Sequence, residues 1–272
     1  MQKTILLFFA LMSFFIQSAF ALSDADLKKM VLPNNRVIKI TGHPQYPPFV
    51  WKDKNKNELI GITIEILEKA FAEINVKAQI VYVETWGRAQ EEVKLGHIDI
   101  LVPPYKNEER VKFYNFSPKT IFMDETVLFV KKGKEFNFKN LTDLKNHRGV
   151  AIINDSFGTE FDNFDKSDLH IDRLSTTEQC FKFLNLDRAE YVVAGLYSGL
   201  SVLKKLKLSE TVTFLPNRVI ITGMYAPVSI KSPWNKDEIG DYLVRKITEY
   251  EKNGLVKKLE KKYIEKMKEE YM

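Results

Sequence analysis

Several residue types are scarce in this 272-residue chain, and each scarcity excludes a class of protein. A single cysteine, Cys180, excludes an internal disulfide framework and any multi-cysteine metal site. The 4 histidines are scattered and form no pair at metal-ligand spacing, so we expect no metal and no cofactor. With 12 glycines and 10 prolines, the chain is neither low-complexity nor fibrous. The net charge of +5, from 41 basic and 36 acidic residues, is small and spread along the chain, so we expect no nucleic-acid partner.

The residues that are abundant are typical of a soluble globular protein. Hydrophobic residues make up 44% of the chain and charged residues 28%, a balance that supports a real core. The length exceeds the roughly 100–200 residues of a typical single domain, so two lobes are as plausible as one.

The first 21 residues have the pattern of a secretory signal peptide. Lys3 supplies a positive start, residues 5–16 form a short apolar run, and Ala19-Phe20-Ala21 gives a small-x-small cleavage site. An N-terminal membrane anchor is the alternative. Because no cysteine follows the apolar run, we do not expect a lipid anchor. No later run approaches the roughly 18 apolar residues of a transmembrane helix, so we expect a soluble protein exported to the periplasm.

The first half of the mature chain alternates strand and helix patterns. Strands are predicted over residues 37–41, 76–83 and 98–102, and helices over residues 61–74 and 86–95. Residues 43–49 include three prolines, which fix the backbone and predict a rigid loop after the first strand. This alternation predicts an open, mostly parallel sheet covered by helices.

The second half repeats the pattern. Strands are predicted over residues 149–153 and 191–194, and helices over residues 157–164, 176–186 and 197–206. Residues 95–102 also align with residues 186–193, since both read as a helix end, an acid and a buried strand. This short internal match favours two related lobes.

Two apolar stretches, residues 120–130 and 219–228, are predicted to connect the lobes, and two polar helices over residues 236–250 and 254–266 close the chain. We therefore predict an α/β fold of two lobes, each an open mixed sheet flanked by helices, joined by two hinge strands. The predicted boundaries are residues 22–122 and 225–272 for lobe 1 and residues 123–224 for lobe 2. Such an architecture suits closure around a ligand.

Short motifs in a characteristic order then indicate a family. They are Tyr46-Pro-Pro-Phe49, Gly61-Ile-Thr-Ile-Glu65, Gly96-His-Ile-Asp99, Asn107-Glu-Glu-Arg110 and Asn253-Gly254. From about residue 37 to residue 263, the chain resembles a divergent member of the extracytoplasmic solute-binding proteins that serve polar amino-acid ABC transporters, bacterial solute-binding protein family 3. The resemblance implies the type II periplasmic-binding-protein-like fold. It also implies a monomer, without enzymatic activity, that delivers a small polar, carboxylate-bearing solute to a membrane permease.

The resemblance also implies a binding site. Arg110 lies where the family places an arginine for a ligand carboxylate, and a guanidinium matches the two oxygens of that group. Tyr46 and Trp86 lie where the family has aromatic walls. Residues 155–158 lie between a strand and a helix start, where free backbone N–H groups suit an anion, although Asp155 opposes one. The candidate ligand-binding residues are Tyr46, Trp86, Tyr105, Arg110, Ser156, Phe157 and Tyr197.

For several candidates an ordinary structural role is the alternative. Arg110 lies in a charged run and would then be a solvated surface residue. Trp86 would anchor a core, and Phe157 and Tyr197 would pack inside lobe 2.

The chain departs from the family pattern at positions that matter for ligand choice. Pro103 and Tyr105 replace small hydroxyl residues, and His43 replaces an acid near the first strand. Gly195 aligns with the aspartate that binds the ligand ammonium group in typical members. An α-amino acid would lose its usual ammonium partner, so a simple carboxylate, a modified amino acid and a small peptide-like solute all stay open.

Two other functions compete with transport. One is a prephenate- or arogenate-dehydratase-like enzyme on the same fold, with Glu84, Asp155 and Glu160 as candidate acids. No nucleophile–base pair supports it, and no hydrolase elbow motif is present. The other is a ligand-sensing subunit for a membrane receptor, which the sequence does not separate from transport.

Overall fold

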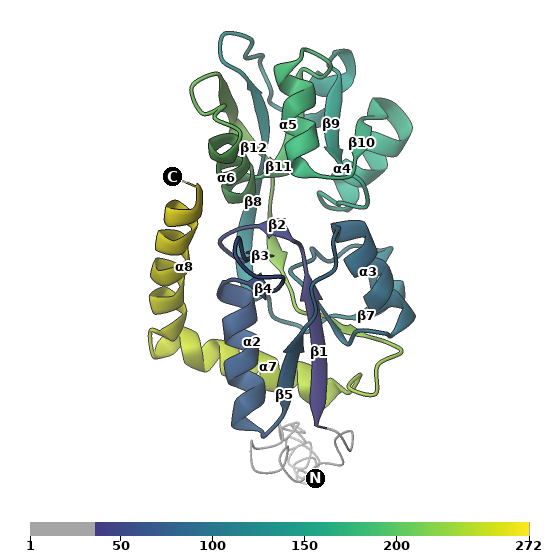
Figure 1. Cartoon of the computed structure of the whole chain (residues 1–272). Helices are drawn as coiled ribbons and strands as arrows, with labels where there is room; N and C mark the ends of the chain where they lie inside the picture. The colour runs from purple at the N-terminus through teal and green to yellow at the C-terminus, as the bar shows by residue number, and fades with distance from the viewer. Residues whose placement is uncertain (1–35, 272) are drawn as a thin grey trace, which may run out of the picture.

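The structure is a computed structural model in which residues 36–271 are described. The signal peptide expected over residues 1–21 lies outside these residues. Two mixed α/β lobes lie one above the other and are connected by long strands (Figure 1). Within residues 36–271, no helix is both long enough and apolar enough to cross a bilayer.

Lobe 1 is built around a five-stranded sheet in the order β5-β1-β6-β13-β7. Strand β1 pairs in parallel with β5 and β6, whereas β13 pairs antiparallel with β6 and β7, so the sheet is mixed. These strands are β1 (Val37–Gly42), β5 (Lys77–Ile80), β6 (Ile100–Val102), β7 (Tyr114–Asn115) and β13 (Val228–Ser229).

Within the described residues, four α-helices and a small second sheet complete lobe 1. The helices are α2 (Ile62–Glu73), α3 (Trp86–Leu95), α7 (Asp237–Lys252) and α8 (Leu255–Tyr271). The second sheet joins β2 (Gln45–Tyr46), β3 (Val50–Lys52) and β4 (Leu59–Ile60). A short 3-10 helix, η1 (Arg110–Lys112), precedes β7. The Thr85 hydroxyl caps α3 by accepting the Arg88 N–H at 3.3 Å, which fixes the start of the helix that carries Trp86.

Lobe 2 has a matching sheet in the order β10-β9-β11-β8-β12. Its strands are β8 (Phe122–Lys131), β9 (Gly149–Ile152), β10 (Asp172–Leu174), β11 (Tyr191–Gly195) and β12 (Val212–Met224). Its helices are η2 (Leu141–Asn146), α4 (Thr159–Phe164), η3 (Asp165–Leu169), α5 (Thr177–Asn185) and α6 (Leu196–Lys205). The pairing is parallel between β9 and both β10 and β11, and antiparallel from β11 to β8 and from β8 to β12.

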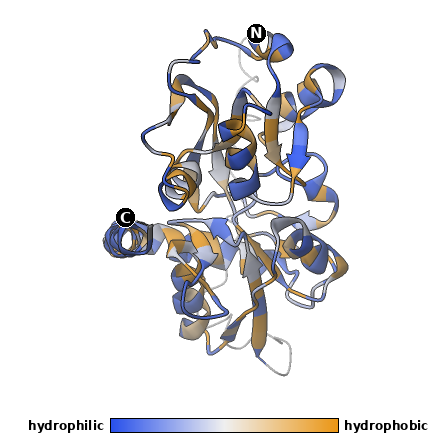
Figure 2. Ribbon diagram, turned by 45° about the horizontal axis from the view of Figure 1, so that its top comes forward, coloured by the Kyte–Doolittle hydropathy of each residue, from blue (hydrophilic) through white to orange (hydrophobic). Residues whose placement is uncertain are grey.

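Apolar side chains fill both faces of the lobe 2 sheet. Along β8, Val127 and Phe129 enter one core cluster, whereas Leu128 and Val130 enter another. A strand buried on both faces has a continuous apolar sequence, which is why β8 has no polar alternation over these four residues. Figure 2 shows this hydrophobic colouring along the strands and a largely hydrophilic α8.

The internal sequence match corresponds to structurally equivalent strands. β6 and β11 each hold the third position of a five-stranded sheet and pair in parallel with β1 and β9, respectively. In both lobes, the acid that precedes the strand accepts a hydrogen bond from a backbone N–H of the neighbouring strand or of the residue just before that strand. Asp99 Oδ2 accepts from Lys39 at 2.7 Å, and Glu190 Oε1 accepts from Arg148 at 3.4 Å. The predicted relation between the lobes is confirmed at this level.

Some element boundaries differ from the predictions. The strand predicted over residues 76–83 is only β5, because β1 beyond Ile40 pairs with β6 alone. The connection predicted over residues 219–228 is the end of the longer β12 plus the start of β13. Pro227 separates the two strands, and a proline cannot donate a ladder hydrogen bond.

Candidate functional site

A small cavity lies where the two lobes meet. Its volume is about 10 Å³, and seven of its eight lining residues come from lobe 1. The lining residues are His43, Tyr46, Trp86, Pro103, Pro104, Tyr105, Arg110 and Asp155. Arg110 and Asp155 also line a larger cleft of about 530 Å³. A volume of about 10 Å³ holds roughly one water molecule, so a larger ligand requires the lobes to move apart.

Arg110 is a buried cation held by neutral acceptors. Only 6% of the surface of this residue is exposed. Its guanidinium donates hydrogen bonds to Tyr105 O at 3.0 Å, Gln90 Oε1 at 3.1 Å and Asn154 O at 3.2 Å. Burial lowers the pKa of Arg110, and the nearby Asp155 carboxylate opposes that shift. No carboxylate within residues 36–271 forms an ion pair with it. Because a buried charge is costly without a counter-charge, the arrangement favours an anion at this position.

Two further buried donors line the same cavity. His43 Nδ1 accepts the Gln45 N–H at 3.0 Å, so the neutral ring carries its proton on Nε2. Burial and then the Arg110 charge lower the pKa of His43 to about 3, which keeps the ring neutral at pH 7. His43 Nε2 and Trp86 Nε1 have no hydrogen-bond partner in the described part of the chain. Together with the Arg110 guanidinium, they form a group of donors that suits an acceptor such as a carboxylate.

Tyr46 and Tyr105 form one wall of the cavity, and a buried acid behind them holds both rings in place. Both hydroxyls donate to Oδ2 of Asp124 on β8, the Tyr105 bond measuring 2.6 Å, and the two hydroxyl oxygens are 3.0 Å apart. Burial raises the pKa of Asp124, and the tyrosine hydroxyls oppose the shift. Gly195 lies beside them: a Cβ there would be 2.2 Å from Tyr46 Oη and 2.9 Å from Asp124 Oδ2. The space that a side chain at position 195 would need is therefore filled by the tyrosine–aspartate cluster.

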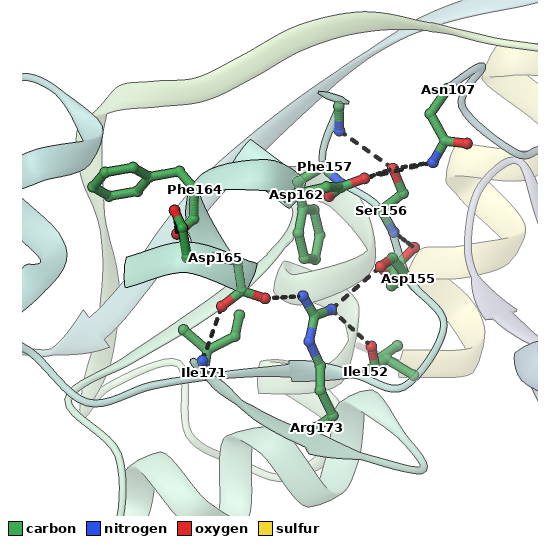
Figure 3. A network of polar contacts seen from close by, with 12 residues as sticks. Asn107, Ile152, Asp155, Ser156, Phe157, Asp162, Phe164, Asp165, Ile171 and Arg173 are labelled. Carbon is green, nitrogen blue, oxygen red and sulfur yellow. Dashed lines mark hydrogen bonds and ion pairs between the residues drawn. The ribbon is translucent and has the colours of Figure 1, made fainter. Parts of the chain in front are cut away.

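The loop after β9 brings Asp155 of lobe 2 to the cavity, and Figure 3 shows the polar contacts of this loop. Ser156 Oγ accepts from Asn107 Nδ2 of lobe 1 at 2.8 Å and lies 2.5 Å from Asp162 Oδ2. Backbone N–H groups of this loop are engaged internally: Ser156 N–H donates to Asp155 Oδ1 at 3.1 Å and Phe157 N–H to Asp162 Oδ1 at 2.9 Å. The prediction that these N–H groups are free for an anion is therefore wrong.

Asp155 is the acid that this loop places at the cavity. It is half-buried, and burial raises its pKa to about 6 against the opposing effect of the Arg110 charge. Arg173 donates to the backbone carbonyl of Asp155 at 3.2 Å and to the carbonyl of Ile152 at 3.3 Å, which fixes the loop on β10 (Figure 3).

The structure brings together four of the seven candidate residues, namely Tyr46, Trp86, Tyr105 and Arg110, all of which line the cavity. Ser156 lies in the larger cleft. Phe157 is 2% exposed and packs edge-to-face on Phe161 in the lobe 2 core, whereas Tyr197 is 46% exposed and contacts Phe49. Neither of these two lines the cavity.

Sequence reasoning missed the residues that hold Arg110 in place. Gln90 and Asn154 are 20 and 44 residues away from it, so no local pattern indicates the contact. Pro103, His43 and Asp155 stand out in the sequence only through their departure from the family pattern or their loop position. Across residues 36–271, no group of three or more His, Cys, Asp or Glu residues could hold a metal ion.

Two mixed α/β lobes, connected by long strands and enclosing a donor-lined cavity, are the architecture of the two-lobed periplasmic-binding-protein fold. Residues 38–266 match the bacterial extracellular solute-binding proteins, family 3, and the chain belongs to this family. The members of this family are solute-binding proteins, so the chain is a binding protein and not an enzyme. No curated protein sequence matches the chain.

Similar solved structures show the same fold at low sequence identity. A mutant of ArgBP from T. maritima has a TM-score of 0.71 and 18% identity, covering 89% of this chain and 99% of that one. An amino acid ABC transporter substrate-binding protein from Streptococcus pneumoniae, bound to L-arginine, has a TM-score of 0.70 and 15% identity, and the match covers 86% of this chain and 96% of that one. A histidine kinase sensor domain with similarity to periplasmic binding proteins has a TM-score of 0.70 and 16% identity, and the match covers 84% of this chain and 96% of that one.

Proposed function

We propose that this protein captures a small polar solute that carries a carboxylate, by closure of its two lobes, and delivers it to the membrane permease of an ABC transporter. The observation that carries the proposal is the Arg110 guanidinium, 6% exposed and without an ion pair among the described residues. His43 Nε2 and Trp86 Nε1, buried and unpartnered in that part of the chain, add two donors beside it.

A carboxylate satisfies this site better than a neutral solute does. The three hydrogen bonds of the Arg110 guanidinium go to two carbonyls and one amide oxygen, none of which carries a negative charge. Hydrogen bonds between a charged donor and a carboxylate contribute about 1.5–3 kcal/mol each. A ligand carboxylate would neutralise the buried guanidinium and accept from the two unpartnered ring donors.

Closure follows from the placement of the cavity between the lobes. The proposed lobe boundaries are residues 22–122 and 225–272 for lobe 1 and residues 123–224 for lobe 2. They are supported by β8, which begins at Phe122, and by β12, which ends at Met224. Bending of these two strands at the boundary would open and close the cavity. We further propose export through the signal peptide over residues 1–21, a periplasmic location without a lipid anchor, and a monomeric state.

Ligand sensing is the second candidate function. The similarity to a histidine kinase sensor domain favours it, because a closed lobe pair can be recognised by a receptor as well as by a permease. Both functions use the same ligand site. A pull-down of solubilised membrane proteins with the ligand-saturated protein separates them by whether a permease or a receptor is recovered.

The test of carboxylate capture compares Arg110→Ala with Arg88→Ala in a thermal-shift screen. Arg88 is the matched control, since it is an exposed arginine on α3 that pairs with Glu84. A true ligand at a hundred times its dissociation constant adds about 2.7 kcal/mol of stability. We expect this gain from a carboxylate-bearing solute in the wild type and in Arg88→Ala, and its loss in Arg110→Ala. Binding that persists in Arg110→Ala, or is confined to solutes without a carboxylate, overturns the proposal.

A further inference from the structure

A groove of about 870 Å³ lies between the two lobes and shares no lining residue with the cavity around Arg110. Lobe 1 lines it with the loop around β2, the turn after β3, the segment after β5 and the end of α8, and lobe 2 lines it with the start of α5 and the second half of α6. The end of α8 lies beside α6 (Figure 1). The volume falls within the range of small-molecule sites, about 300–1,000 Å³.

Every cation that lines this groove is a lysine, and both lobes contribute. The five are Lys52 and Lys54 of lobe 1 and Lys204, Lys205 and Lys207 of lobe 2, all of them exposed. Within residues 36–271, only Lys205 forms an ion pair, with Glu178. The Lys52 ammonium lies 5.1 Å from the centre of the Tyr82 ring. Four lysines therefore line the groove without a negative partner from the described chain.

Most acids of the groove are already paired. Four of the five lining acids have a basic partner: Asp53 and Glu270 have Lys266, Glu84 has Arg88 and Glu178 has Lys205. Glu210 is the one lining acid without an ion pair within residues 36–271. Because unpaired lysines outnumber unpaired acids, the groove presents a positive potential to a ligand.

Stabilisation of a helix end explains only part of this cluster. Lys204 and Lys205 lie in the last turn of α6, where a positive charge interacts favourably with the helix dipole. Lys207 lies beyond the helix, and Lys52 and Lys54 belong to the other lobe. Like charges on the two sides of one groove repel each other, so this arrangement becomes favourable when an anion lies between them.

We propose that this groove is a second binding site, for a multiply charged anion of the phosphate class. No arginine is among its lining residues, and arginine is the side chain whose planar fork fits a carboxylate. A lysine ammonium is a compact point charge with three donors, which suits the several charged oxygens of linked phosphate groups. Because both lobes supply lysines, the bound anion joins the lobes from outside the cavity around Arg110.

The experiment titrates the wild-type protein with orthophosphate, pyrophosphate and tripolyphosphate by calorimetry, with no other solute present. Affinity should rise with the charge of the anion and fall between low and physiological ionic strength. Lys54→Gln and Lys204→Gln should each weaken tripolyphosphate binding about fivefold, the effect of one lysine charge near an anionic group. Lys257→Gln is the matched control, because Lys257 is an exposed lysine of α8 that does not line the groove.

The outcomes decide between a built site and general attraction to a basic protein. Tripolyphosphate that fails to bind the wild type at low ionic strength overturns the proposal. Equal weakening by Lys54→Gln, Lys204→Gln and Lys257→Gln also overturns it, because the anion then responds only to overall charge. An effect of Lys204→Gln without one of Lys54→Gln contradicts a site shared by both lobes.

A second arm identifies the source of the phosphate. The wild type and the same variants are sedimented with phosphatidylglycerol vesicles. Vesicle binding that is lost in Lys54→Gln and Lys204→Gln assigns the phosphate to a lipid headgroup, whereas tripolyphosphate binding without vesicle binding assigns it to a soluble solute. The proposed capture of a carboxylate is tested separately, since none of the substituted lysines lines the cavity around Arg110.

Discussion

At the scale of single residues, His43 links the cavity to pH. Its ring is 3% exposed, with Nδ1 engaged by the Gln45 N–H and Nε2 unpartnered within residues 36–271. Burial and the Arg110 charge lower its pKa from 6.5 to about 3, so the folded protein keeps the ring neutral while the unfolded chain protonates near pH 6.5. Below that pH the unfolded state binds more protons, and stability falls as the pH decreases.

We predict that this single residue costs about 2 kcal/mol of unfolding free energy between pH 7 and pH 5. Asp155 acts in the opposite direction, because its folded pKa of about 6 lies above the unfolded value and its protonation favours folding. The measurement is therefore the difference in unfolding free energy between the wild type and His43→Asn, obtained from urea unfolding at several pH values from 5 to 7. The difference between them should change by about 2 kcal/mol, with His97→Asn, at an exposed histidine, as the control. A difference that stays constant with pH contradicts the prediction.

The candidate site could be predicted from sequence to the extent that its residues sit inside motifs. Arg110, Tyr46 and Trp86 were indicated by motif position, and all three line the cavity. Asp124 and Gly195 form one unit only because β8 and β11 pair antiparallel, with Gly195 opposite Thr126. That pairing joins residues 71 positions apart in numbering, and no local pattern indicates it.

At the scale of elements, the junction of β11 and α6 is so closely packed at Gly195 that it leaves no room for a side chain. Gly195 has an ordinary backbone φ of −60°, so its conformation does not require glycine. The requirement is space, since a Cβ would approach Tyr46 Oη to 2.2 Å. Tyr46 is held there by Asp124, so moving its ring breaks that hydrogen bond.

We predict that Gly195→Ala destabilises the protein by about 1–3 kcal/mol, the usual cost of overpacking. The same change should weaken ligand binding, because Tyr46 forms a wall of the cavity. Gly240→Ala, in α7, is the control: its nearest atom is Ser117 Cβ at 4.0 Å, and an alanine in a helix should stabilise by about 0.5–1 kcal/mol. Urea unfolding measures both, and the prediction fails if the two variants shift stability in the same direction.

Most elements could be predicted from periodicity and caps, and the exceptions have local causes. The helix predicted over residues 86–95 coincides with α3, whose Thr85 cap and αL Gly96 mark both ends in the sequence. The helix predicted over residues 157–164 begins only at Thr159, because Ser156 N–H donates to the Asp155 side chain and Phe157 N–H to the side chain of Asp162 in α4. Such side-chain contacts with the backbone depend on the folded loop and set the boundary.

At the scale of the whole molecule, a few polar contacts join the two lobes. Gln45 of β2 donates to Glu178 Oε1 at 3.1 Å and accepts the Thr177 N–H at 3.3 Å, both at the start of α5. On the outer side, α8 reaches α6, where Ser201 Oγ lies 3.1 Å from Met267 Sδ. Separation of the lobes, as proposed for ligand entry, would break these contacts, so the contacts would stabilise the proposed closed state.

We predict that Gln45→Ala shifts the protein toward open lobes. Loss of its two hydrogen bonds removes about 1–2 kcal/mol from the closed state, which lowers the apparent affinity for the solute about 5–30-fold. Small-angle scattering should show a larger radius of gyration for the ligand-free variant than for the ligand-free wild type, and equal values at saturating solute. Gln79→Ala is the matched control, since Gln79 is an exposed glutamine on β5 of lobe 1. Equal affinities and equal scattering for the two variants would show that closure of the lobes does not depend on the Gln45 contacts.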